Sequence, residues 1–231
     1  MSYGVLINGI RSDSVNLILT EKYISSPKVK SKRIEIPGRN GSIDLSEVLT
    51  GAPTYEDRTM KLTFYSRYKV QDWAEEISKL NNLWCGNRVE IVFDDDVSYR
   101  WKGRVVSIQP AYNGRNETIQ LEAIVEPYKY DIFSSAVDWE WDCFDFNTGI
   151  INEAGNLIVD GTTSFTLVCR KKVSWPEFIV SDEMTVTYQD VTYHLIPGTQ
   201  KLYRLFFHEG NNDLVFNGHG SVSINYVGGQ L

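Results

Sequence analysis

The chain has 231 residues, of which 42% are hydrophobic and 13% aromatic, and its formal net charge is −7. This length suffices for one large or two small domains without metal or disulfide staples, and the acidic balance excludes binding of nucleic acid by a basic face. Three widely spaced cysteines without a CxxC pair exclude a zinc ribbon and a disulfide framework, and they fit synthesis in a reducing cytoplasm. We expect neither a signal peptide nor a membrane span, because no apolar window is long enough.

The N-terminal residues predict a short β-hairpin. Residues 3–7 and 15–19 are rich in β-branched and aliphatic residues, and Asn8-Gly9 lies between them. An Asn-Gly pair between two such runs is typical of a tight return between strands.

Residues 21–58 predict an extended arm. Glycines and prolines interrupt this stretch, charges of both signs lie between them, and it has no clean hydrophobic period. A connection this long in a compact domain usually has a use, and its aliphatic residues are too many for a solvated linker. We therefore expect an ordered arm that packs on its own surface or on a neighbour's. The basic run at residues 28–33 favours a solvated flank of this arm over a phosphate-binding patch, because acidic residues follow closely.

The next elements predict a sheet covered by one helix. Residues 59–65 alternate cleanly, with Met60, Leu62 and Phe64 on the inner face. A stripe at steps of three and four residues then predicts an amphipathic helix that ends before Gly86. The stripe consists of Val70, Trp73, Ile77, Leu80 and Trp84.

Three further strands complete the N-terminal half. Residues 88–93 alternate, the acidic triplet 94–96 favours a hairpin turn over a calcium loop, and residues 98–108 resume the strand pattern. We expect a β-bulge at Gly103. Asn113-Gly114 predicts another turn, and residues 117–125 another strand.

The second half predicts a β-sandwich. Pro127 is unsuited to a central strand, so we interpret residues 126–131 as the exit from a first domain at 1–132 into a second at 133–231. Short runs then recur every ~8–12 residues, which is typical of a sandwich. The expected strands are 137–144, 156–159, 164–170, 177–180, 184–188, 191–195, 201–207, 213–216 and 221–226, with turns at Pro197-Gly198, at 210–212 and at Asn217-Gly218.

The polar residues predict no catalytic centre, no metal site and no cofactor. His194, His208 and His219 are spaced unlike metal ligands. Residues 218–221 (GHGS) lack the strand-to-helix setting of a nucleophile elbow. The carboxylates near residue 140 alternate with Trp139 and Trp141, which favours the wet face of a strand over a glycosidase pair. We expect the protein not to be an enzyme.

One binding hypothesis stays open for the second domain. Trp139, Trp141 and Trp175 could stack on sugar rings, as in a carbohydrate-binding adhesin, or they could fill the core of the sandwich. Core packing is the commoner use of tryptophan in such a domain.

Several motifs in chain order resemble the distal tail protein (Dit) family of long-tailed phages that infect Gram-positive bacteria. IPGRNGSIDLSE at 36–47 is the most specific of them, and one departure is Cys85, where the family pattern has a histidine before the glycine. The resemblance covers essentially the whole chain. The other segments are YGVLING, GAPTYEDR, a helix ending in WCG, VEIVFDDDVSYRWKGRV and VEPYKYD, and in the second domain WEWDCFDF and GNNDLVFNGHGSVSINYVGG.

The resemblance implies a mainly β protein, with a tail-tube-like first domain carrying one helix and the arm, and a galectin-like or carbohydrate-module-like sandwich as the second. It implies a homohexameric ring at the phage tail tip that lets DNA pass, with partners in the tail-tube protein, a tail-associated lysin or hub protein and a receptor-binding protein. The arm would contact the neighbouring subunit through Ile36, Pro37, Gly38, Arg39, Asn40, Gly41, Asp44, Tyr55 and Arg58.

Overall fold

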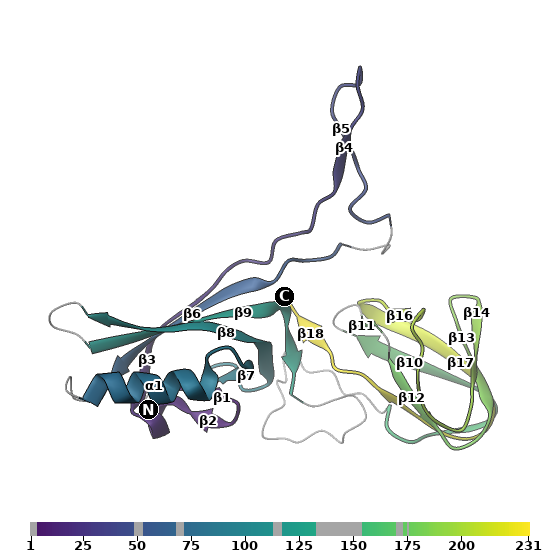
Figure 1. Cartoon of the computed structure of the whole chain (residues 1–231). Coiled ribbons are helices and arrows are strands. Elements are labelled where there is room, and N and C mark those ends of the chain that lie inside the picture. Colours follow the sequence, from purple (N-terminus) through teal and green to yellow (C-terminus); the bar gives the residue numbers. More distant parts are fainter. Residues whose placement is uncertain are drawn as a thin grey trace. The chain divides into compact units, whose positions relative to one another are not determined.

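The computed structural model describes residues 4–48, 53–67, 72–112, 117–132, 154–169, 173–174 and 176–231 (Figure 1). The chain divides into two compact units, residues 1–129 with Leu231 and residues 130–230. The domain boundary expected after Ile132 lies close to this division. The strand expected at 137–144 and the turn expected at Asn113-Gly114 fall outside the described residues.

One antiparallel sheet organises the first unit. Its strands follow the order β2-β1-β7-β8-β9-β6-β3. Their bounds are β1 Val5–Ile7, β2 Ile10–Arg11, β3 Leu17–Ile24, β6 Arg58–Ser66, β7 Arg88–Phe93, β8 Tyr99–Tyr112 and β9 Glu117–Asp131, with a 3-10 turn η1 at Ser12–Val15. The period-2 pattern is confirmed, because Met60, Leu62 and Phe64 on β6 are fully buried.

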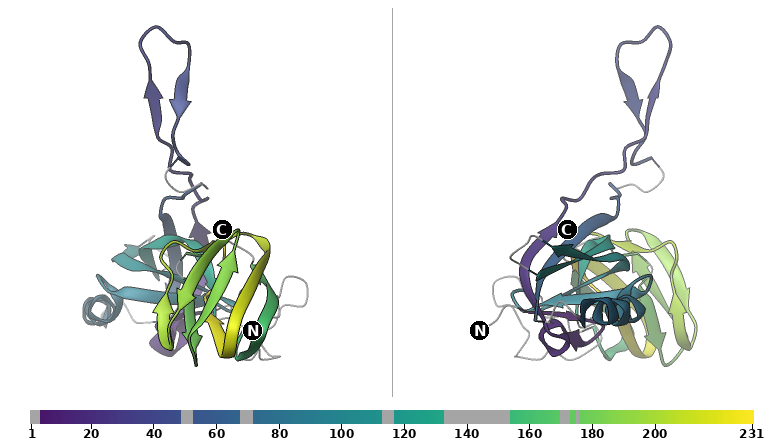
Figure 2. Two further views of the ribbon diagram at one scale, coloured as in Figure 1. Left: turned by 90° about the vertical axis from the view of Figure 1, so that its right-hand side faces the viewer. Right: turned by 60° about the vertical axis from the view of Figure 1, so that its left-hand side comes forward.

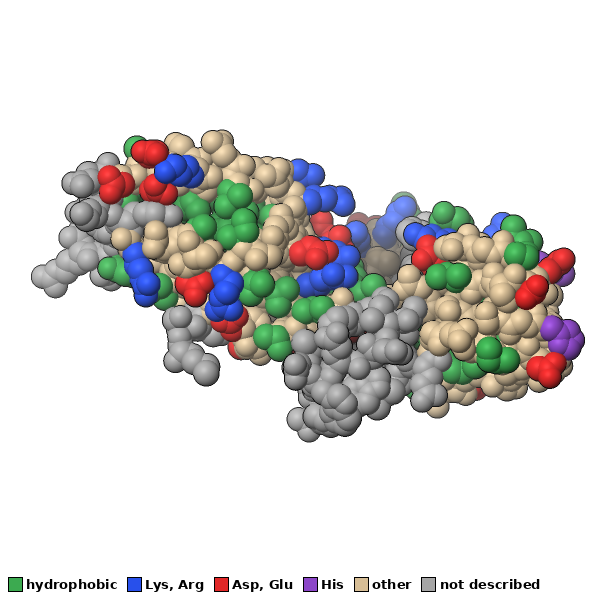
Figure 3. All heavy atoms as spheres, turned by 90° about the horizontal axis from the view of Figure 1, so that it is seen from below, with side chains coloured by type: hydrophobic (Ala, Val, Ile, Leu, Met, Phe, Trp, Pro, Cys, Tyr) green, Lys and Arg blue, Asp and Glu red, His purple; other side chains and the backbone are tan. Residues whose placement is uncertain are grey.

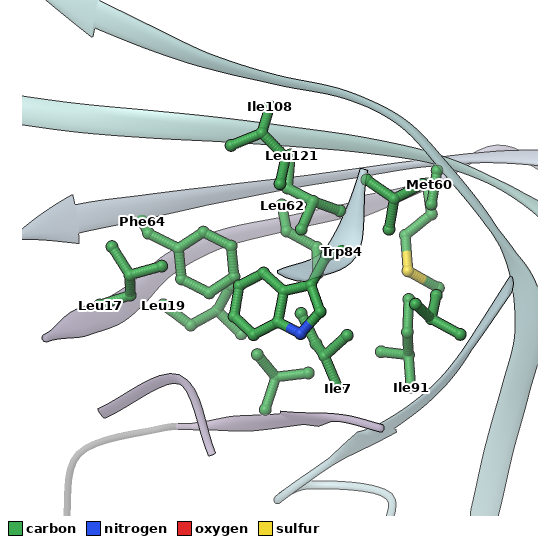
Figure 4. Close-up of a cluster of buried hydrophobic side chains, with 14 of the residues drawn as sticks. Ile7, Leu17, Leu19, Met60, Leu62, Phe64, Trp84, Ile91, Ile108 and Leu121 are labelled. Carbon is green, nitrogen blue, oxygen red and sulfur yellow. The ribbon is translucent and has the colours of Figure 1, made fainter. Parts of the chain in front are cut away.

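The single helix of the described residues closes one face of this sheet. Helix α1 (Trp73–Trp84) buries Leu80 and Trp84, as the stripe predicts, although Val70 lies outside the described residues. Gly86 follows in the left-handed region with φ +77 and donates its N–H to the Val105 carbonyl of β8. Figure 4 shows the Trp84 indole among aliphatic side chains from β1, β3, β6 and β9, which places the helix end over the centre of the core.

The N-terminal hairpin differs from the prediction. Asn8-Gly9 does form the turn, but the chain returns into the two-residue strand β2, with Ile7 opposite Ile10. Residues 17–19 instead open β3, which pairs with β6 at the other end of the sheet. Both runs were correctly predicted to be strands. Their pairing with each other was wrong, because strand pairing depends on residues that are distant in sequence.

The bulge expected at Gly103 is also corrected. Gly103 pairs in regular register with Val89 of β7, and the one irregularity described in this region lies between Leu19 and Glu21 of β3. Gly103 serves a close approach, because a Cβ added there would lie 2.7 Å from Val125 Cα of β9.

Pro127 does not end its strand, contrary to expectation. Strand β9 continues to Asp131. The ladder between β6 and β9 stops at Arg58 opposite Val125, so the missing N–H of Pro127 removes no bond from that ladder.

The acidic triplet forms the expected turn between β7 and β8, and each of its carboxylates meets a cation. The hydrogen bonds that Asp94 accepts from Arg11 also raise the pKa of the Arg11 guanidinium. These contacts tie the turn to elements on both sides of it. The pairs are Asp94 with Arg11 at 2.8 Å, Asp95 with Lys22 at 2.7 Å and Asp96 with Lys129 at 2.7 Å.

A curled sheet organises the second unit, as the sandwich prediction requires (Figure 1). Strand β17 runs along its centre and pairs with β10 on one edge and with β13 and β12 on the other. The strands of this sheet are β10 Leu157–Cys169, β12 Glu177–Val180, β13 Met184–Tyr188, β14 Val191–Leu195, β15 Gly198–Lys201 and β17 Gly210–Asn225. Strands β11 (Val173–Ser174) and β16 (Phe206–Phe207) form a separate pair, and β18 (Gly229–Gln230) pairs with β9.

The predicted strands β12, β13 and β14 are confirmed to the residue. Where two runs were expected at 156–159 and 164–170, the structure has the single strand β10. The runs at 213–216 and 221–226 likewise merge into β17, and the run at 201–207 is divided between β15 and β16.

Two turn signals inside β17 were misread. Gly218 lies in the strand at φ +149, where an added Cβ would be 2.6 Å from the Met184 Cβ of β13. The glycine thus allows two strands to approach closely. Asn212 is 1% exposed and accepts hydrogen bonds from Tyr188 Oη (2.7 Å) and from the His208 N–H (2.8 Å), so it fixes the start of the strand and does not form a turn.

Candidate functional site: an extended arm

The arm is the part of the first unit that the sheet does not account for. Strand β3 runs to Ile24 and β6 begins at Arg58, so the arm spans residues 25–57 and is shorter than the predicted 21–58. Figures 1 and 2 show it as a ribbon of two legs joined at a tip. None of its described residues is buried.

The tip is a β-hairpin. Strands β4 (Arg33–Glu35) and β5 (Ser42–Asp44) pair antiparallel, with Ile34 opposite Ile43. Gly38 and Gly41 have φ +83 and +78 in the connection between them, a conformation that glycine adopts at little cost. The hairpin escaped the sequence reading because both of its faces meet solvent, which leaves no alternation of polar and apolar residues.

A side-chain network closes the hairpin below its strands. Ser46 Oγ accepts the Lys32 N–H at 2.8 Å, and the Ser46 N–H donates to Asp44 Oδ1 at 2.9 Å. The hydrogen bonds from Ser46, assisted by the charge of Arg33, lower the pKa of Asp44. These bonds give the tip a defined geometry without a hydrophobic core.

The middle of the arm is a second short ladder. Val29 and Tyr55 form an antiparallel bridge, the Lys30 N–H donates to the Thr54 carbonyl and the Glu56 N–H donates to the Lys28 carbonyl, both at 2.8 Å. The two legs therefore pair with each other at the middle of the arm as well as at its tip.

Tyr55 and Arg58 anchor the base to the sheet. The Tyr55 ring meets that of Tyr128 edge to face, with centroids 5.8 Å apart, and burial, followed by the influence of Tyr55, raises the pKa of Tyr128. Arg58 is buried, and its Nε donates to the Ser25 carbonyl at 2.6 Å while its guanidinium lies 4.8 Å from the centre of the Trp101 ring.

Arg58, together with Tyr55, thus lies apart from the other residues named for a subunit contact. Its Nη1 also donates to the Pro127 carbonyl at 3.4 Å, and burial lowers the pKa of its guanidinium. Its place indicates that it holds the arm to its own sheet, whereas residues 36–44 belong to the exposed tip. Sequence reasoning missed Trp101, Pro127 and Tyr128, because nothing local marks a strand residue as a contact of the arm.

Replacing Arg58 with alanine is expected to destabilise the first unit by about 2–3 kcal/mol, because hydrogen bonds to charged groups are worth about 1.5–3 kcal/mol and the partly buried Ser25 and Pro127 carbonyls would lose a donor. Ser25 and Thr59 exchange backbone and side-chain bonds at 2.9 Å beside this site, so their amide protection from hydrogen exchange should fall. Arg67→Ala, at an exposed position, is the control. Unchanged protection at Ser25 would contradict the anchoring role.

A hollow lies on the outer face of β7, β8 and β9, with a volume of about 530 Å³. Gly103 forms part of its floor, and Val106 and Ile124 line it with 47% and 37% exposure. Its charged lining has both signs, with Asp57, Glu90 and Glu126 against Arg88, Lys102 and Arg104.

The other residues considered for catalysis or metal binding do not come together in a site among the described residues. His194, His208 and His219 are all exposed, and among the described residues no group of three or more His, Cys, Asp or Glu could hold a metal ion. Burial raises the pKa of the Cys169 thiol to about 11, which keeps it protonated near neutral pH. The tryptophans considered for sugar stacking, Trp139, Trp141 and Trp175, lie outside the described residues.

On the face in Figure 3, the described side chains show blue, red and green groups interspersed, without a broad basic area. The described part of the chain has no helix long and apolar enough to cross a membrane.

Comparison with known proteins gives similarity at the level of structure. No protein-family model matches the chain, and no curated protein matches it by sequence. The crystal structure of the SPP1 Dit protein, described as a paradigm of the hub adsorption apparatus in phages infecting Gram-positive bacteria, is similar with a TM-score of 0.67 and 14% identity over 100% of both chains.

Two structures of the phage p2 baseplate in its activated conformation are similar at a lower level. The one with Sr has a TM-score of 0.40 and 7% identity over 97% of both chains. The one with Ca has a TM-score of 0.38 and 8% identity over 97% of this chain and 98% of the other.

Proposed function

We propose that this chain, which has the fold of the SPP1 Dit protein over its whole length, is a structural hub protein of a phage tail tip. The observation that carries the proposal is an ordered arm without a buried residue, attached to a chain of that fold. A long hairpin exposed on all sides buries too little surface to be stable on its own. Such an arm acquires a use when another molecule covers it.

The copies of this chain assemble as a homohexameric ring. In a ring, one patch of each subunit meets a different patch of the next, and the rotation closes. The arm supplies one such patch, with Ile34 and Ile36 45% and 42% exposed near its tip. Residues Pro37, Gly38, Arg39, Asn40, Gly41 and Asp44 continue the same surface.

The ring joins the tail-tube protein to a tail-associated lysin or hub protein, with a receptor-binding protein as a further partner, and DNA passes through its lumen. The net charge of −7 supports passage, because like charges keep the DNA from sticking to the wall. The place of such a ring is the virion tail tip.

The role is structural, not enzymatic. Its support is positive: a Dit-like fold and an arm suited to holding subunits together. The adhesin alternative depended on Trp139, Trp141 and Trp175, and no observation on the described residues favours it.

Light scattering on the purified chain is expected to give a mass of about six times the 26.4 kDa of one chain. The same measurement is to be made with a tail-tube protein present, and negative-stain images should show closed rings. A monomeric mass under both conditions would contradict the proposal. A monomer that also shows a saturable change of tryptophan fluorescence with cell-wall saccharide would support the adhesin instead.

A further inference from the structure

The two legs of the arm carry net charges of opposite sign. The ascending leg, residues 28–35, contains four basic residues and one carboxylate, Glu35 at the end of β4. The descending leg, residues 42–57, contains carboxylates but no lysine or arginine. The basic residues of the ascending leg are Lys28, Lys30, Lys32 and Arg33, and the acidic residues of the descending leg are Asp44, Glu47, Glu56 and Asp57.

These charges are directed to solvent, and few of them are used within the arm. All eight residues are exposed. Arg33 and Asp44 approach to 3.7 Å, and between described residues the structure gives the other six no ion pair. Ion pairs between the two legs therefore account for only two of the eight charges. They do not explain why the basic residues lie on one leg and the acidic residues on the other.

The backbone also leaves both legs open on the outside. The sheet of the tip has two strands, β4 and β5, which pair only with each other among the described residues. Each leg thus offers an outer edge, and the net charges of the two legs differ in sign. An exposed strand edge is a ready site for contact with another chain.

The sign pattern decides what kind of contact fits. In a two-fold dimer of arms joined edge to edge, the same leg of two copies would meet, so positive would face positive. In a head-to-tail arrangement the ascending leg of one arm meets the descending leg of the next, and their net charges attract. The hollow on β7, β8 and β9 offers no such preference, because its lining has three acidic and three basic residues.

We propose that the arms of successive copies lie side by side, the basic ascending leg of one against the acidic descending leg of its neighbour. The arm thereby sets the direction in which subunits follow one another and excludes two-fold pairing. This inference rests on the proposed ring, and it identifies the arm's partner as the arm of a second copy.

Complementary charge reversals test the pairing. One variant, Lys28→Glu with Lys30→Glu and Lys32→Glu, makes the net charge of both legs negative. The other, Glu47→Lys with Glu56→Lys and Asp57→Lys, makes the net charge of both legs positive. Both variants leave the Arg33–Asp44 pair in place. Each variant alone is expected to form rings only at a protein concentration about tenfold or more above that of the wild type, because like charges then face one another. An equimolar mixture should restore assembly, because an even-numbered ring closes with alternating subunits.

The mixture separates the contact between arms from effects inside one arm. If the charges mattered only within each hairpin, or if the arm docked in the hollow, mixing the two variants would not restore rings. Such a result, with both variants folded by circular dichroism, would overturn the proposal. Arg67→Glu with Lys201→Glu and Arg204→Glu is the matched control, since all three residues are exposed and lie outside the arm.

Failure of this inference is distinguishable from failure of the proposed function. If each reversal variant forms rings as readily as the wild type while shortening of the arm abolishes them, the hub function stands and the pairing of legs is wrong. If the wild type itself never forms rings, the proposed function fails first.

Discussion

Shortening the arm to its base is expected to convert the ring into folded monomers. Replacing residues 31–53 with Asn-Gly keeps the last backbone pair, between Lys30 and Thr54, and closes it with a two-residue turn suited to a hairpin. The sheet and its core lie outside the excised segment. Light scattering should then give the mass of one chain in place of about six, with an unchanged far-ultraviolet spectrum.

A graded variant localises the effect within the arm. Deleting residues 39–46 removes half of the connection and all of strand β5. It leaves the middle ladder and the base, including the Tyr55–Tyr128 contact. We expect this deletion to abolish rings as well, because the tip carries most of the residues assigned to the subunit contact. Rings in images of both deletion variants would contradict a role of the arm in assembly, whatever the fold.

Replacing Trp84 with alanine is expected to cost the first unit about 3–5 kcal/mol, the usual range for a buried large aromatic residue. Trp84 is 1% exposed and lies against β-strand residues from both halves of the sheet (Figure 4). Its loss would leave a cavity where the helix end meets the core. Urea unfolding, followed for the transition of the first unit, measures the change.

Two further substitutions act as controls for Trp84. Leu83→Ala lies on the same helix at 39% exposure and should change stability by less than about 1 kcal/mol. Trp84→Phe should cost less than Trp84→Ala, because the phenyl ring fills part of the cavity. Both substitutions remove the indole N–H, which has no hydrogen-bond partner among the described residues. A cost for Trp84→Ala equal to that for Leu83→Ala would show that the helix is not needed for the core.

The core of the first unit and the arm serve different purposes: the core stabilises one subunit, and the arm is proposed to join subunits. The core residues of the first unit follow the period-2 pattern of strands and the pattern of a helix, and the burial of these residues stabilises the monomer. None of the arm residues that the structure describes is buried, so changes there should affect assembly much more than the stability of one subunit. Arg58 links the two, because its side chain is buried under the base of the arm.

Local pattern alone predicted the strands at the first unit's core, the helix over them and three strands of the second unit. Met60, Leu62 and Phe64 alternate because one face of β6 is buried along its whole length, and Leu80 and Trp84 recur at the step of a helix for the same reason. Burial on one face leaves its period in the sequence whatever the partner is. The fold class followed from these patterns, and the Dit resemblance added the expected order of the parts.

Only the tertiary structure decided which strands pair, and it reversed several local signals. Gly103 and Gly218 read as a bulge and a turn, yet both lie in strands where a neighbouring backbone or side chain comes too close for a Cβ. Pro127 read as a strand end, yet the β6 ladder stops before it. The arm read as an irregular connection, yet it is a hairpin whose legs pair from Lys28 to Glu56. In each case the deciding atom lies on a residue distant in sequence, so no local window contains it.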